Sequence, residues 1–282
     1  MALILMIGQA SAQTRAGADE PWQKLLFKGH HLAYQCQGSG SPTVLLESPG
    51  AVSAAEAYRG IAATLAQTQR TCIFERLGLG RSDPLPPGRL QTVKGRSEEL
   101  DALVRLEAGA APVVLVGYSL GGMVARHYAA TQPQWVAGLL LVDAVHEDWL
   151  AELESKMDPE DWTRVQDAQQ WFRQRLGYDH WVSQAEVKAT KLPENLPVRI
   201  ISRGLPYLRV RFIGISEPAV TLFNESHDRL QAQMLGLTSR TSRVVAQRSE
   251  HMVIESAPEL VLSELGLLIQ DVLANARAAP RP

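Results

Sequence analysis

The chain has 282 residues, of which 45% are hydrophobic and 21% are charged, and its formal net charge at pH 7 is −2. This length suits one large α/β domain, and the nearly balanced charge argues against a nucleic acid or another polyanion as partner. The sequence contains no cysteine–histidine cluster with metal-ligand spacing and no glycine-rich phosphate loop. We therefore expect a small-molecule substrate, with no metal and no organic cofactor.

The first twelve residues resemble a secretion signal. An apolar run from Ala2 to Ile7 precedes Ala10-Ser11-Ala12, which is similar to an A-x-A cleavage site. The run is too short to span a bilayer, which takes about 20 apolar residues, so no stable membrane insertion is expected. No Lys or Arg precedes the run, so two interpretations stay open. Either residues 1–12 are removed and 13–282 form a secreted or periplasmic domain, or the segment is the tail of a cytoplasmic protein.

Strands and helices are expected to alternate along the rest of the chain. Residues 23–38 favour an N-terminal hairpin. Strands are then expected at residues 43–46, 71–74, 112–116, 136–142, 198–202 and 242–246, and helices at 54–66, 98–106, 120–131 and 258–274. Such alternation predicts βαβ units in a mostly parallel sheet, whose functional residues lie at the carboxyl ends of the strands. Ser119, Asp143 and the loop at 47–50 are expected at this edge.

Residues 146–196 depart from this alternation. The segment is polar and helical in character, and it holds Trp149, Trp162, Trp171 and Trp181. An aromatic-rich excursion from the sheet is typical of a lid over a binding pocket, and we expect two of the four indoles to face that pocket.

The two cysteines, Cys36 and Cys72, both fall in predicted strands. An exported protein could join them in a disulfide. The alternative, which the sequence favours, is two buried free thiols that pack like small hydrophobic side chains.

The strongest chemical signal is Gly117-Tyr118-Ser119-Leu120-Gly121, which lies between a predicted buried strand and a helix. This G-x-S-x-G pattern is typical of a sharp strand-to-helix turn that exposes a nucleophilic serine above the sheet. The flanking residues must be glycine because a side chain there would collide with the neighbouring strand and helix. Ser119 is therefore the predicted nucleophile, and His251, which follows the last predicted strand, is the predicted base.

With these motifs the sequence resembles the α/β-hydrolase family, in its serine-nucleophile branch. Residues 76–83 resemble the family's D-R-x-G-x-G-x-S loop, with Glu75 in place of the Asp, and residues 257–261 resemble the P-E-x-V start of the helix after the histidine. The resemblance implies a mostly parallel central sheet with helices on both faces and a helical lid inserted after the sixth strand. It also implies a structural role for Arg76 and Ser82.

The acid of the implied Ser-acid-His order has several candidates. Many family members carry it after the seventh strand, but residues 200–207 contain no carboxylate. Some relatives place it at the end of the sixth strand, which predicts Asp143. Glu217 and then Asp228 stay in reserve, and Asp143 could instead have a loop-capping role.

An oxyanion hole needs two N–H donors. Leu120, directly after the nucleophile, is predicted to supply one. The family's usual His-Gly-x loop is replaced here by Glu47-Ser48-Pro49, and proline has no N–H. Gly50 or Ala51 is therefore expected to supply the second donor.

The resemblance implies a serine hydrolase that cleaves a carboxylic ester of a small to medium apolar substrate through an acyl-enzyme. An aminopeptidase, a lactonase, a C–C bond hydrolase and a non-catalytic ligand-binding relative remain alternatives. The serine nucleophile argues against epoxide hydrolase and dehalogenase chemistry, which in this family resembles attack by an aspartate.

Overall fold

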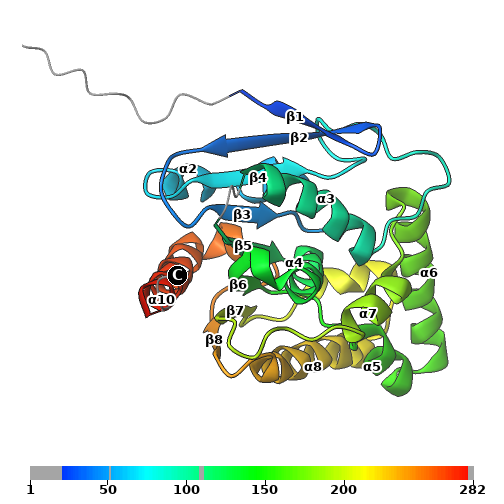
Figure 1. The fold of residues 1–282 in the computed structure, drawn as a ribbon. Coiled ribbons are helices and arrows are strands. Elements are labelled where there is room, and N and C mark those ends of the chain that lie inside the picture. The colour runs from blue at the N-terminus through cyan, green and yellow to red at the C-terminus, as the bar shows by residue number, and fades with distance from the viewer. Residues whose placement is uncertain (1–20, 51, 108–110, 279–282) are drawn as a thin grey trace, which may run out of the picture.

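A computed structural model describes residues 21–50, 52–107 and 111–278, so the predicted signal at 1–12 and Ala51 lie outside the described residues. A sheet of eight strands forms the centre of the molecule, in the order β1-β2-β4-β3-β5-β6-β7-β8 (Figure 1). The strands are β1 (Gln23–Phe27), β2 (His30–Gln37), β3 (Val44–Glu47), β4 (Thr71–Glu75), β5 (Val113–Tyr118), β6 (Val136–Val142), β7 (Val198–Arg203) and β8 (Thr241–Ala246). Strands β1, β2 and β4 pair antiparallel, and the neighbours from β4 to β8 pair parallel, which confirms the predicted sheet.

Helices pack on both faces of this sheet (Figure 1). One apolar cluster joins the sheet to α3 (Val93–Glu107) and α4 (Leu120–Thr131). A second joins the opposite face to α1 (Ala54–Ala57), α2 (Ala62–Leu65), α9 (Val253–Ser256) and α10 (Pro258–Ala278). The central strands are continuous apolar runs because both of their faces are covered. In the described part of the chain, no helix combines the length and apolar character needed to cross a bilayer.

A cap of helices lies beside the carboxyl ends of the strands. The segment after β6 forms α5 (Trp149–Lys156), α6 (Pro159–Leu176) and α7 (His180–Lys188), as the lid prediction required. The segment after β7 adds the 3-10 helix η2 (Leu208–Ile213) and α8 (Glu217–Gln233), and the short 3-10 helix η3 (Met234–Gly236) follows α8. Another short 3-10 helix, η1 (Pro133–Trp135), lies outside the cap, between α4 and β6. Helices α5, α6, η2 and α8 share one apolar cluster of their own. The cap thus has two parts, and the sequence pattern indicated only the first.

Two predicted helices have different bounds in the structure. The helix expected at 54–66 is broken into α1 and α2, since Tyr58 ends α1 and places its hydroxyl 2.7 Å from the Glu47 carbonyl. Gly60, a poor helix former, lies within this break. Helix α3 begins at Val93 rather than at residue 98, because the Val93 amide finds a tertiary acceptor in the Ser183 hydroxyl at 3.1 Å.

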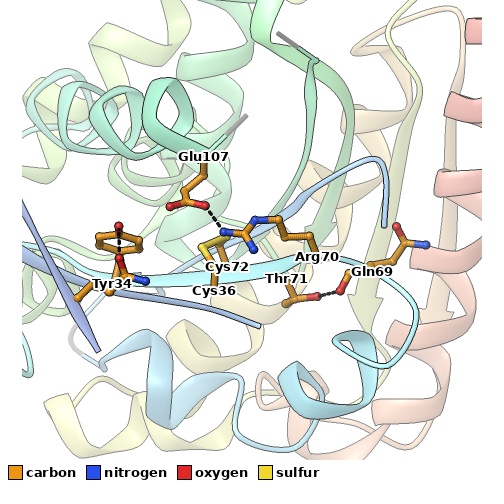
Figure 2. Close-up of a disulfide and its surroundings, with 8 residues drawn as sticks. Tyr34, Cys36, Gln69, Arg70, Thr71, Cys72 and Glu107 are labelled. Carbon is orange, nitrogen blue, oxygen red and sulfur yellow. Dashed lines mark hydrogen bonds and ion pairs between the residues drawn. A yellow bond between two sulfur atoms is a disulfide. The ribbon is translucent and has the colours of Figure 1, made fainter. Parts of the chain in front are cut away.

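The two cysteines form a disulfide, so the prediction of free thiols is wrong (Figure 2). Cys36 and Cys72 are direct partners in the antiparallel register of β2 and β4, which brings the two sulfurs together. An ion pair between Arg70 and Glu107 lies beside the bond (Figure 2). With Glu107 the sulfurs form the one group of possible metal ligands in the described ranges, but the disulfide occupies both sulfurs.

Candidate active site

Strand β5 ends in a strained turn at Ser119. The residue has φ 54° and ψ −123°, a region that residues with a side chain rarely adopt. A Cβ atom on Gly117 would lie 2.7 Å from the Gly121 carbonyl oxygen, and one on Gly121 would lie 2.7 Å from the Glu47 carbonyl oxygen. Both positions therefore require glycine, as the sequence predicted. The turn leaves Ser119 lining a cavity above the sheet edge.

His251 lies on the loop after β8, between Ser119 and Asp143. Its Nε2 atom is 3.0 Å from the Ser119 hydroxyl oxygen, and its Nδ1 atom is 2.6 Å from a carboxylate oxygen of Asp143. The rings of Tyr118 and Tyr207 lie 5.3 and 5.4 Å from the imidazole, centre to centre. The Tyr118 hydroxyl also donates to the His251 carbonyl at 2.9 Å. These contacts orient the imidazole toward the serine.

Asp143 follows β6 and is almost completely buried. Burial by itself would raise the pKa of Asp143. Hydrogen bonds from His227 and His251 outweigh that effect and hold the pKa well below its usual range. The carboxylate is therefore ionised at neutral pH and can only accept hydrogen bonds, so Nδ1 of His251 carries a proton and Nε2 is the nitrogen that faces the serine.

The structure brings Ser119, His251 and Asp143 together and leaves the reserve carboxylates elsewhere. Glu217 is an exposed residue at the start of α8, where it pairs with Arg211 at 2.7 Å. Neither Glu217 nor Asp228 lines the cavity.

Two further residues contact Asp143 that the sequence did not indicate. His227, on α8, places Nε2 2.8 Å from one carboxylate oxygen. Arg203, at the end of β7, donates its backbone amide at 3.0 Å and a guanidinium N–H at 3.2 Å. Burial lowers the pKa of His227, so this imidazole is neutral and donates to Asp143. One signal for Arg203 was available in the sequence. Strand β7 ends beside β6 in the parallel sheet, and its last residue is an arginine in a segment without a carboxylate, so Arg203 could have been expected next to Asp143.

The loop after β3 is held by a buried ion pair. Arg76 lies 3.0 Å from a carboxylate oxygen of Glu47, and both side chains are fully buried. Arg76 also donates to the carbonyl groups of Pro49 and Gly50. Burial raises the pKa of Glu47 to about 7, although the Arg76 charge opposes this rise. Glu47, which departs from the family's usual histidine, thus anchors the arginine that fixes the loop.

Of the predicted oxyanion donors, Leu120 and Gly50 both line the cavity beside Ser119. Leu120 is the first residue of α4, so its N–H has no acceptor within the helix. Gly50 lies next to Leu120, since an added Cβ would be 3.7 Å from the Leu120 side chain, at ordinary van der Waals distance. Ala51 lies outside the described residues.

The cavity has a volume of about 240 Å³ and mostly apolar walls. The cap contributes its aromatic and aliphatic lining, namely Trp149, Phe172, Leu176, Phe223 and Leu230. Trp149 packs edge-on against Phe223, with ring centres 5.5 Å apart. Trp162 is instead buried within the cap, and Trp171 and Trp181 are exposed. The expectation that two of the four tryptophans face the pocket is therefore wrong, since one does.

Residues 43–197 match the model of a family described as alpha/beta hydrolase fold. The chain belongs to this family. Among curated proteins, the cis-3-alkyl-4-alkyloxetan-2-one decarboxylase of Shewanella oneidensis is 30% identical over 116 residues, which are 41% of this chain and 36% of that protein. The chain thus aligns with little more than a third of that relative's length.

Solved structures of similar fold cover nearly the whole of this alpha/beta hydrolase. A probable hydrolytic enzyme of Pseudomonas aeruginosa superposes with a TM-score of 0.64 at 17% identity, over 88% of this chain and 93% of that one. A thermophilic esterase of Thermogutta terrifontis superposes with a TM-score of 0.60 at 16% identity, over 90% and 99%. At such identity these likenesses show the fold alone.

Proposed function

We propose that this alpha/beta hydrolase is a serine hydrolase that cleaves a carboxylic ester through an acyl-enzyme intermediate. The observation that supports it most directly is the hydrogen-bonded series from the Ser119 hydroxyl through His251 to Asp143, with separations of 3.0 and 2.6 Å. Nucleophile and base lie within hydrogen-bond reach, and a buried carboxylate orients the base. Ser119 is the nucleophile, His251 the general base and Asp143 the orienting acid.

Each step follows from this geometry. As the Ser119 oxygen attacks the ester carbonyl carbon, Nε2 of His251 takes the hydroxyl proton and the carbonyl oxygen becomes an oxyanion. The Leu120 amide and an amide of the loop at Gly50 are the proposed donors to that oxyanion. The C–O bond to the alcohol then breaks, and His251 returns the proton to the departing oxygen. Water attacks the acyl-serine by the same route, which releases the acid and restores Ser119.

The test is hydrolysis of 4-nitrophenyl acetate and butyrate by the wild type and by Ser119→Ala. Loss of the nucleophile should lower kcat by a factor on the order of 10⁶. Ser155→Ala, which removes an exposed hydroxyl from α5, is the matched control and should leave kcat unchanged. A fluorophosphonate should modify Ser119 in the wild type, as located by peptide mass spectrometry. Hydrolysis that survives in a folded Ser119→Ala variant would refute the proposed mechanism.

A second set of substrates distinguishes ester hydrolysis from the alternative activities. The curated relative is named for an oxetan-2-one, which is a four-membered lactone, and lactones therefore belong in the panel. Aminoacyl 4-nitroanilides test the aminopeptidase alternative, and vinylogous 1,5-diketones test C–C bond hydrolysis. We expect the largest kcat/KM for open-chain esters. Modification of Ser119 without turnover of any of these would favour a ligand-binding relative.

We also propose that the protein works in an oxidising compartment outside the cytoplasm. The support is the Cys36–Cys72 disulfide, because such bonds persist in secreted and periplasmic proteins and are rare in reducing cytosol. Fractionation of producing cells, with thiol alkylation before lysis, tests this. Protein found only in the cytosol, with both thiols alkylated, would contradict it.

A further inference from the structure

Four arginine side chains are buried in the described part of the chain, and one of them differs from the others. Three lie against a carboxylate. The pairs are Arg76 with Glu47, Arg126 with Glu147, and Arg203 with Asp143. Arg96, on α3, contacts no carboxylate among the described residues. The charges of Glu47 and Glu99 favour the Arg96 cation from a distance, but neither carboxylate forms an ion pair with it. A buried charge is costly unless it is directly paired, so Arg96 is a candidate for binding an anionic group.

The contacts of Arg96 leave one side of its guanidinium group unused. Nε donates to the Gln91 amide oxygen at 3.3 Å, and the guanidinium lies 4.0 Å from the centre of the Tyr178 ring. The Nη1 atom is buried and has no hydrogen-bond partner among the described residues. Burial lowers the pKa of Arg96 to about 9, so the group is still a cation at neutral pH. The side-chain amide of Gln91 donates in turn to a carboxylate oxygen of Glu99 at 2.8 Å, so Gln91 lies between Glu99 and the arginine.

Arg96 lines the same cavity as Ser119. Gln169, on α6, lines it too, is 5% exposed, and has a buried amide oxygen without a partner among the described residues. These two polar groups sit in a wall that is otherwise largely aromatic and aliphatic. Polar groups with unused hydrogen-bonding capacity in an apolar pocket are the usual means by which a protein recognises the polar end of a ligand.

We propose that Arg96 binds a carboxylate carried by the substrate. The substrate class is then an ester with an ionised carboxyl group at the end of a short apolar chain, such as a monoester of a dicarboxylic acid or an acylated hydroxy acid. This inference rests on the proposed esterase function, which it makes more specific. The carboxylate would supply the direct ion-pair partner that Arg96 lacks, through charge-assisted hydrogen bonds.

The test compares esters that differ only in that charge. For a carboxylate on the acyl side, mono-4-nitrophenyl glutarate and adipate are measured against 4-nitrophenyl pentanoate and hexanoate. For a carboxylate on the alcohol side, O-acetyl-4-hydroxybutyrate is measured against butyl acetate by pH-stat. In the wild type we expect kcat/KM for the charged member of at least one set to exceed that of the neutral member by about 10- to 100-fold.

Arg96→Gln should reduce this ratio of kcat/KM values to about one, and Arg96→Lys should keep part of it. The ratio is insensitive to a general loss of active protein. Arg59→Gln removes an exposed positive charge and is the matched control, in which the wild-type ratio is expected. Because Arg96→Gln could fail to fold, Gln169→Glu is measured as a second variant: it places a negative charge in the wall of the same cavity and should lower the same ratio.

Binding is measured separately from catalysis. Calorimetry of Ser119→Ala with monomethyl glutarate should detect binding that the Arg96→Gln change weakens by about tenfold or more. Ser119-dependent hydrolysis with no preference for the charged ester in either set, and no such binding, would overturn this inference and leave the proposed function intact. Hydrolysis that does not depend on Ser119 would instead overturn the proposed function, and the calorimetry would still decide the role of Arg96.

Discussion

The two sides of the cavity are built differently. On the sheet side, Ser119, Asp143 and His251 each follow a β-strand, and they are held by hydrogen bonds of 2.6 and 3.0 Å. On the cap side, Trp149 and its aromatic and aliphatic neighbours offer contact area. The sheet thus supplies a small set of positioned polar groups, while the cap supplies a shaped apolar surface. The difference indicates that the sheet positions the reacting groups and that the cap shapes the apolar part of the cavity.

The two regions also differ in their hydrophobic packing. The sheet is packed between two clusters that cover its two faces, and cap helix α7 contributes to one of them, whereas α5, α6, η2 and α8 share a smaller cluster of their own. At the junction an ion pair joins Arg126 of α4 to Glu147, just before α5, at 2.5 Å. A substitution among the outer cap helices should therefore leave the sheet residues largely unchanged.

After loss of the Ser119 nucleophile itself, the largest effect is expected from Asp143→Asn on the sheet side. The asparagine cannot hold His251 in the required tautomer, so kcat should fall by a factor on the order of 10⁴. Burst kinetics and kcat with 4-nitrophenyl acetate measure this. Glu217→Gln, which changes an exposed carboxylate of the cap, is the control and should have no effect on kcat. A loss below about tenfold in folded Asp143→Asn would assign the orienting role to another group.

The disulfide should affect stability and leave catalysis unchanged. Replacing both cysteines, Cys36→Ala and Cys72→Ala, removes a cross-link between residues that are 36 positions apart in the sequence. The unfolded chain then gains conformational freedom. The loop-closure argument predicts a loss of about 3 to 4 kcal/mol in the free energy of unfolding. Urea unfolding measures it, and kcat/KM should stay at the wild-type value because neither cysteine lines the cavity. A reductant should lower the stability of the wild type and leave the double variant unaffected.

The junction between cap and sheet should weaken in acid. Burial opposes the charge of Glu147, but the hydrogen bonds and charge of Arg126 outweigh it and lower the pKa of this carboxyl to about 2. The folded pKa is below the unfolded value, so the stabilisation is present above about pH 4.3 and is lost as the pH falls toward 2.

Glu147→Gln should remove this pH dependence. The free energy of unfolding should be about 2 to 3 kcal/mol lower than in the wild type at pH 6, and the two proteins should converge near pH 2. Unfolding curves at several pH values check this, with exposed Glu154→Gln as the control. Parallel pH curves for wild type and Glu147→Gln would show that the pair does not hold the junction.

The smallest effect is expected from Trp149→Ala on the cap side. Removing this wall should raise KM for 4-nitrophenyl octanoate by about tenfold and change kcat for the acetate much less, because a long acyl chain offers more apolar surface to the cap than an acetyl group does. Trp181→Ala, which truncates an exposed tryptophan of the same segment, should leave both constants unchanged. Equal losses for the acetate and the octanoate would mean that Trp149 supports the sheet residues rather than the substrate.

Local rules account for what could be predicted from the sequence. The turn at Ser119 depends on the steric demands at Gly117 and Gly121, which are visible in five consecutive residues. The order of strands and helices, and thus the fold, follows from apolar runs and turns of a few residues each. The position of His251 after the last strand follows from that order. The first cap segment was recognisable because its polar, tryptophan-rich composition interrupts the alternation.

Contacts between distant segments were decided only by the tertiary structure. Asp143, Glu217 and Asp228 were all candidates in the sequence, and it is the parallel pairing of β6 with β7 and the packing of α8 that place Arg203 and His227 against Asp143 alone. The cysteine pairing likewise depends on the register of β2 and β4. The sequence could not show that Arg96 forms no ion pair, because this depends on where the carboxylates lie in the fold. Short-range steric and hydrophobic preferences can be inferred from neighbouring residues in the sequence. Contacts between residues far apart in sequence depend instead on the register of the strands and the packing of the helices.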